Sequence, residues 1–228
     1  MSFEILRKQP VKFYHQGGLK FFEPFRAVDK NKNPLELSWN LKPESPAIIA
    51  KSTYNSDISI YNIETTHNEF KGVSIVANPQ RKEIGEVLNL ASLITLKENN
   101  VNEFNVFALS DYIQFYAKYG FNIMTDNINE ILHNLKFLVK NKEEKFSDMV
   151  YSAKYFKSQL ERNATKDKKL LSNNLISDYL RTLARNGKKI DGDDLYSHTH
   201  MRFSSLDSIR NRDYLNSLLD KHEINYKI

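Results

Sequence analysis

The chain has 228 residues, of which 40% are hydrophobic and 12% aromatic, and its formal net charge is +5. This composition is typical of a globular protein, and the absence of cysteine excludes disulfides, thiolate zinc sites and a cysteine nucleophile. Residues 1–7 lack the long apolar stretch of a secretion signal, and no apolar run reaches the roughly eighteen residues of a membrane span. We therefore expect a cytoplasmic protein that has no contact with a membrane.

The first part of the chain predicts mainly strands. β-Branched and aromatic residues indicate strands at 11–14, 35–39, 47–51 and 58–64. Glycine pairs and clusters of polar residues between them indicate turns. Residues 19–28 are the one place in the first 46 residues with some helical pattern, so we expect a helix there.

Residues 72–119 predict two strand-helix units in succession. An apolar strand at 72–77 leads through a polar loop into a helix at 83–98, whose apolar residues recur every three or four positions. A second strand at 104–108 then leads into a helix at 111–119. A right-handed crossover would make the two strands parallel neighbours, with any ligand beyond their carboxyl ends.

The second of these helices has recognisable ends. Ser110 or Asp111 is placed to cap its start, and Gly120 is placed to end it in a left-handed conformation. Its last residues read Tyr-Ala-Lys-Tyr-Gly-Phe from Tyr116 to Phe121. Its aromatic residues also fit a helix that packs against a core, so the pattern has a purely structural interpretation as well.

This ending resembles the GNAT acyltransferase superfamily, whose members carry a pattern such as Tyr-Glu-Lys-x-Gly-Phe after their fifth strand. The upstream loop is similar too, because residues 80–85, Gln-Arg-Lys-Glu-Ile-Gly, follow the family pattern Gln/Arg-x-x-Gly-x-Gly/Ala with Glu83 at the first glycine position. The alternative for this loop is an ordinary strand-to-helix connection. The resemblance implies an α/β fold with a GNAT-like mixed central sheet flanked by helices.

The resemblance also implies that acetyl-CoA is the co-substrate, with its pyrophosphate held by backbone amides at a helix N-terminus. A carboxylate at position 83 would repel that pyrophosphate unless it points away or pairs with Arg81 or Lys82. The residues that the resemblance assigns to cofactor binding are Ile75, Ala77, Gln80, Arg81, Lys82, Glu83, Ile84, Gly85 and Glu86.

Direct transfer of an acyl group to an amine needs a base and an acid. Glu64, at the end of its strand, is our first choice for the base and Glu69 the second. Tyr116 matches the tyrosine with which many family members protonate the thiolate leaving group. A backbone N–H where the strands near residues 75 and 106 diverge would stabilise the oxyanion.

The remainder of the chain predicts a mainly helical C-terminal region. Apolar periodicity indicates helices at 128–138, 146–160, 169–185 and 205–222, with short strands at 121–124 and 196–203. If the later strand belongs to the sheet, the helices between the two strands form an insertion. Residues 127–228 hold 19 basic and 14 acidic residues and so carry the whole excess charge.

These patterns lead to one expected organisation and two expected functions. Residues 1–126 would form a GNAT-like acyl-CoA-binding domain, and residues 127–228 a helical accessory region. The first function is an N-acyltransferase that moves an acetyl or other acyl group from acyl-CoA to an amine of a small molecule or protein. The alternative is an inactive GNAT-like scaffold that binds a protein or nucleic acid through its basic helices.

The alternative partners differ in how well the sequence supports them. Acidic residues are interleaved with the lysines of residues 127–228, so we favour a protein partner there over nucleic acid. The aspartates and histidines of residues 191–200 match no known metal-binding spacing, and we expect no metal site.

Overall fold

The computed structural model describes residues 9–42, 46–53, 57–66, 68–77, 83–141 and 143–228. It divides into two compact units, which we describe separately. Unit 1 comprises residues 1–104 and 208–228, and unit 2 comprises residues 105–207. The mixed α/β class is confirmed, as are helices flanking a sheet and a helical region toward the C-terminus. The functional division into residues 1–126 and 127–228 stays a prediction.

Unit 1 begins with a hairpin of β1 (Phe13–Gln16) and β2 (Leu19–Phe22). Gly17 and Gly18 join the strands, both with positive φ (58° and 81°), which suits a tight two-residue hairpin turn. An antiparallel meander follows, with each strand paired to the next in the chain. Its strands are β3 (Phe25–Val28), β4 (Pro34–Asn40), β5 (Ala47–Ser52), β6 (Ile58–Thr65) and β7 (Glu69–Val76).

The helix that we expected at residues 19–28 is therefore wrong, because this stretch contains β2 and β3. Pro24 stands between the two strands and cannot continue a helix, since it lacks the N–H and clashes with the preceding turn. The aromatic residues on either side pack into the core instead: the rings of Phe22 and Phe25 meet edge to face at 4.9 Å.

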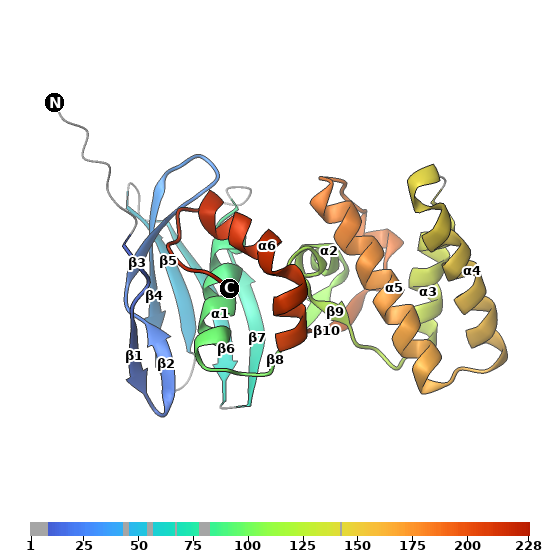
Figure 1. Cartoon of the computed structure of the whole chain (residues 1–228), viewed down its shortest axis with the longest axis horizontal. Coiled ribbons are helices and arrows are strands. Elements are labelled where there is room, and N and C mark those ends of the chain that lie inside the picture. Colours follow the sequence, from blue (N-terminus) through green and yellow to red (C-terminus); the bar gives the residue numbers. More distant parts are fainter. Residues whose placement is uncertain (1–8, 43–45, 54–56, 67, 78–82, 142) are drawn as a thin grey trace. The chain divides into compact units, whose positions relative to one another are not determined.

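Helix α1 (Ile84–Glu98) lies against β5, β6 and β7, as Figure 1 shows. Twelve of its fifteen residues are buried, whereas the sequence pattern predicted one buried face. The sheet covers one side of α1, and the C-terminal segment, residues 208–228, covers another. It contacts Glu86 in the first turn of α1 through Lys221, and Glu98 in the last turn through Tyr226. A helix covered on more than one side is buried over most of its circumference.

Unit 2 holds the sheet order β8 (Glu103–Leu109), β10 (His198–Ser204), β9 (Asn122–Ile123), with the first two residues of β8 belonging to unit 1. Helix α2 (Ser110–Lys118) directly follows β8. Its N-cap is Leu109, which makes no side-chain capping bond, so the predicted caps Ser110 and Asp111 are instead its first two residues.

Three helices form most of the rest of unit 2 and lie side by side in Figure 1: α3 (Ile128–Val139), α4 (Ser147–Arg162) and α5 (Lys166–Arg185). Short 3₁₀ turns at Glu144–Phe146 and Gly192–Asp194 complete the unit. Asn127 caps α3, and its Oδ1 accepts from the Asn129 N–H at 3.0 Å.

The predicted insertion is confirmed, because α3, α4 and α5 lie in sequence between two strands that pair with each other. In β9 and β10, Ile123 is the antiparallel partner of Met201. Helix α5 is joined to β9, since the Ile123 N–H donates to Ser177 Oγ at 2.9 Å and Arg181 donates to Asn122 at 2.7 Å.

The last helix, α6 (Ser205–Lys221), continues into unit 1 from Ser208 onward. Residues 222–228 then run beside the first strands of unit 1: the Val28 N–H donates to the His222 carbonyl at 3.0 Å, and Pro10 bridges Asn225. In the part of the chain that the structure describes, no helix is long and apolar enough to span a membrane.

Candidate functional site

The candidate site in unit 1 is the start of α1, which follows β7 in the chain. Glu83, the residue before the helix, has a left-handed backbone (φ 58°, ψ 22°). Glycine adopts this conformation most readily, and position 83 is where the family pattern has a glycine. Among the described residues, no side chain caps this helix start. The geometry of a helix N-terminus leaves backbone N–H groups that favour an anion.

Two carboxylates in this turn are held by the end of α6. The Lys221 ammonium forms an ion pair with Glu83 and also lies 2.8 Å from Glu86 Oε1. The Glu86 side chain is 2% exposed, whereas those of Glu83 and Lys221 are 28% and 39% exposed. The partner of Glu83 is therefore a lysine of the C-terminal segment, and its negative charge is balanced within unit 1.

His222 is the second partner of Glu86. Its side chain is fully buried, with Nε2 2.7 Å from Glu86 Oε1 and Nδ1 2.7 Å from the Val28 carbonyl oxygen. A carbonyl oxygen only accepts, so Nδ1 donates to it. His222 thereby links Glu86 to the backbone of Val28.

The electrostatics of Lys221 follow from this arrangement. Burial alone would lower the pKa of the Lys221 ammonium, but hydrogen bonds to Glu83 and Glu86 and their negative charges outweigh it. The pKa of Lys221 therefore lies above its ordinary value of 10.5. The ammonium stays charged across the physiological range.

Glu83, Glu86 and His222 each offer one possible metal-ligand atom, and these atoms all lie within 4.8 Å of one another. The Lys221 ammonium bonds to both carboxylates and thus already supplies a cation at this position. The arrangement is that of a hydrogen-bonded charge network.

The other predicted residues of unit 1 lie on strands or outside the described residues. Glu64 is the penultimate residue of β6, and its exposed carboxylate lies 3.7 Å from Lys71 of β7, its partner in the register. Ile75 is half-buried in β7 opposite Tyr61, and Ala77 follows the strand. Ile84, Gly85 and Glu86 open α1. Gln80, Arg81 and Lys82 lie outside the residues that the structure describes.

Tyr116 belongs to unit 2, where its side chain is mostly buried. The residue is 7% exposed, and its ring meets Phe115 at 5.2 Å and Phe121 at 5.3 Å, both edge to face. The aromatic helix therefore packs into a core, as its structural interpretation predicted. The role of the Tyr116 hydroxyl as an acid stays a prediction, as does the role of Glu64 as a base.

Sequence reasoning did not identify Lys221 and His222. They lie 135 and 136 residues after Glu86, at the end of a helix that the sequence placed in an accessory region. No local pattern marks them, since a Lys-His pair at the end of a surface helix is ordinary. Only the return of the chain to unit 1 brings them to α1.

No family model and no curated protein sequence matches the chain. A solved structure, a GNAT family acetyltransferase from Elizabethkingia anophelis with acetyl-CoA bound, is 22% identical to it with a TM-score of 0.32. The match covers 36% of this chain and 57% of that one. This chain thus spans somewhat more than half the length of that protein.

Proposed function

We propose that the chain is an acyl-CoA-dependent N-acyltransferase that binds the pyrophosphate of acetyl-CoA at the start of α1. The observation that carries this proposal is the state of Glu83: it adopts the backbone conformation of the glycine that it replaces, and its carboxylate is paired with Lys221. The left-handed backbone keeps the turn that the family pattern has at this position. The ion pair offsets the negative charge with which a glutamate would otherwise repel a phosphate.

The proposed cofactor contacts come from two neighbouring elements and the loop between them. Ile75 lies near the end of β7 and Ala77 follows the strand. Glu83, Ile84, Gly85 and Glu86 would offer backbone N–H groups at the start of α1. Gln80, Arg81 and Lys82 complete the proposed set. An anion at a helix N-terminus gains about 0.3–1 kcal/mol from the macrodipole, in addition to its hydrogen bonds.

In the proposed reaction, the amine nitrogen attacks the thioester carbonyl carbon, an amide bond forms and the carbon–sulfur bond breaks. Glu64 would take the proton that the amine loses, directly or through water, with Glu69 as the second choice. Tyr116 would give a proton to the departing thiolate. The products are the N-acylated acceptor and free coenzyme A.

Calorimetry of the full chain with acetyl-CoA tests the binding step. We expect a dissociation constant well below the millimolar range, and the absence of heat at millimolar acetyl-CoA would refute the proposal. Release of free thiol from acetyl-CoA with a panel of small amines and lysine peptides then tests the transfer. Binding without thiol release from any acceptor would leave a CoA-binding protein that is not an acetyltransferase.

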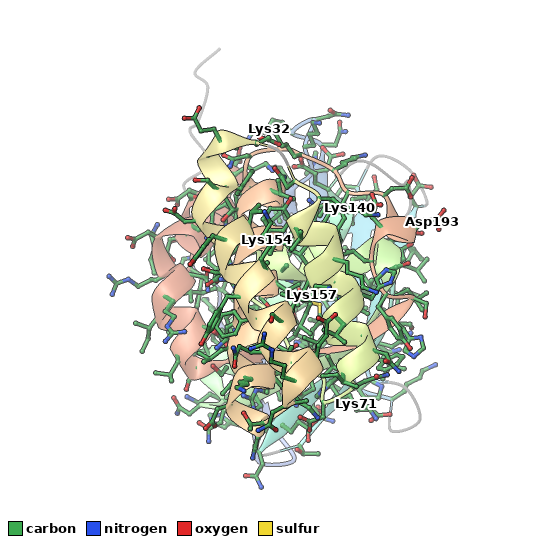
Figure 2. The ribbon with its side chains drawn as sticks, turned by 90° about the vertical axis from the view of Figure 1, so that its right-hand side faces the viewer. Lys32, Lys71, Lys140, Lys154, Lys157 and Asp193 are labelled. Carbon is green, nitrogen blue, oxygen red and sulfur yellow. The ribbon has the colours of Figure 1, made fainter. Side chains whose placement is uncertain are left out.

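A non-catalytic scaffold is the second candidate, and the surface of α4 favours it. Tyr151 and Tyr155 are 76% and 56% exposed one turn apart. Lys154 and Lys157 project from the same helix, as Figure 2 shows. Exposed aromatic residues beside cations are typical of surfaces that bind a partner. Failure to bind acetyl-CoA, together with loss of a captured partner in Tyr151→Ser/Tyr155→Ser, would support this function.

A further inference from the structure

We propose that Lys221 and His222 are positioning residues for the acyl-CoA site, and that Lys221 compensates the negative charge at the start of α1. Affinity for acyl-CoA would then depend on the C-terminal segment, which sequence analysis assigned to an accessory region. This inference rests on the proposed function, and it adds two residues that the family pattern does not contain.

The need for these residues follows from the charges in one helical turn. Glu83 and Glu86 stand three positions apart at the helix start, where phosphate groups would lie. Two uncompensated carboxylates would repel a diphosphate within a few ångströms and cancel the attraction of the helix dipole. The Lys221 ammonium contacts both carboxylates and removes this repulsion.

The two residues act at different depths. His222 and Glu86 are buried, so their pairing keeps the Glu86 carboxylate turned into the protein and away from a ligand. Lys221 and Glu83 are partly exposed and lie between this buried pair and the solvent. Lys221 therefore sets the charge that an approaching anion meets, and His222 acts through Glu86.

Hydrogen bonds hold the C-terminal segment, and with it Lys221 and His222, in place. The Tyr226 hydroxyl donates to Glu98 at 2.7 Å, and Lys97 Nζ donates to the Lys227 carbonyl at 2.7 Å. The Ile228 N–H donates to Asn216 Oδ1 at 2.8 Å. These bonds attach the segment along α1, so Lys221 and His222 are built into unit 1.

Calorimetry with acetyl-CoA on four full-length proteins tests the inference. Lys221→Gln removes the ion pair that Lys221 forms with Glu83, and we expect about tenfold weaker binding. In Lys221→Gln/Glu83→Gln both side chains are neutral, so affinity should return to within about threefold of the wild type. Lys221→Arg keeps the positive charge and should bind nearly as tightly as the wild type. Only a role in charge compensation predicts rescue by the second substitution.

Two controls make the result specific. Lys136→Gln removes the same charge from an exposed lysine of α3 and should leave affinity unchanged. S-acetylpantetheine, which carries the same thioester without phosphates, should bind the wild type and Lys221→Gln equally. A loss of affinity for this ligand in Lys221→Gln would mean that the substitution disturbs the fold, and it would overturn the inference.

The outcomes separate this inference from the function beneath it. If the wild type does not bind acetyl-CoA, the proposed function fails and the inference with it. If the wild type binds and Lys221→Gln binds equally well, or if Glu83→Gln does not restore its affinity, the inference alone fails. If Lys221→Gln does not fold, the test of the inference relies on Glu83→Gln alone. The inference expects Glu83→Gln to bind acetyl-CoA at least as tightly as the wild type.

Discussion

Glu86 and His222 form a buried pair although 136 residues separate them, with Glu86 Oε1 2.7 Å from His222 Nε2. Their side chains are 2% and 0% exposed. The other ring nitrogen of His222 donates to the Val28 carbonyl, so the imidazole joins α1 to β3 as well. This pair connects three parts of unit 1 that lie far apart in the sequence.

Removal of His222 should therefore be costly for the fold. His222→Ala leaves a buried carboxylate with one cationic partner and a buried carbonyl without a donor, and we expect a loss of about 3 kcal/mol in the free energy of unfolding. Urea denaturation measures it. The matched control is His15→Ala, an exposed histidine of β1, which should change the stability by less than about 0.5 kcal/mol. Equal effects of the two substitutions would contradict a stabilising role for the pair.

The left-handed backbone of Glu83 predicts an order of stability between two variants. Glycine adopts φ near 58° without penalty, whereas residues with a Cβ pay about 1 kcal/mol. Glu83→Gly and Glu83→Ala both lose the ion pair with Lys221, so their difference isolates the backbone term. We expect Glu83→Gly to be about 1 kcal/mol more stable than Glu83→Ala in urea denaturation. The reverse order would show that position 83 is not held in this conformation.

Lys221 predicts a change of stability at high pH. Burial alone would lower its pKa, but its hydrogen bonds to Glu83 and Glu86 raise it above 10.5, so folding favours the charged form. This contribution is complete below the pKa of the unfolded state and is lost as pH rises through the higher pKa of the folded state. The stability difference between wild type and Lys221→Gln should thus be constant from about pH 7 to 9 and shrink above about pH 10.5. For Lys154→Gln we expect almost no difference at any of these pH values.

Tyr116 and Glu64 give separate predictions for the proposed chemistry. Tyr116→Phe keeps the ring in its aromatic cluster, so the protein should remain folded while kcat falls about 100-fold through loss of the acid. Glu64→Gln breaks an exposed ion pair of small energetic value and should lower kcat while stability changes by less than about 1 kcal/mol. Thiol release at saturating acetyl-CoA measures both. Unchanged kcat in either variant would remove that residue from the proposed mechanism.

Local patterns predicted most of the elements in the chain. The strands at 47–51 and 58–64 and the helix at 83–98 match β5, β6 and α1 within one residue at each end, because their turns and apolar spacing are encoded nearby. The weak helical spacing at 19–28 does not produce a helix, because Pro24 lies within it and cannot continue one, and the stretch contains β2 and β3. The predicted strand at 196–203 is β10. Its pairing with β9 is seen only in the structure.

The candidate site was less accessible to sequence reasoning. The helix start at Glu83 could be placed from the loop pattern, but the partner of its carboxylate could not. Arg81 and Lys82, which are adjacent in sequence, were the expected partners and lie outside the described residues, whereas Lys221 belongs to the segment of residues 208–228. Long-range ion pairs leave no periodic signal, since each member is compatible with an ordinary solvated surface.

The discontinuity of unit 1 affects how it can be synthesised. Residues up to 104 leave the ribosome long before residues 208–228, and the whole of unit 2 is translated in between. Until Lys221 and His222 emerge, Glu83 and Glu86 lack these two partners, and α1 lacks the contacts of the C-terminal segment. Unit 1 therefore completes its folding only after residues 208–228 have been translated, when the inserted helices have had time to form.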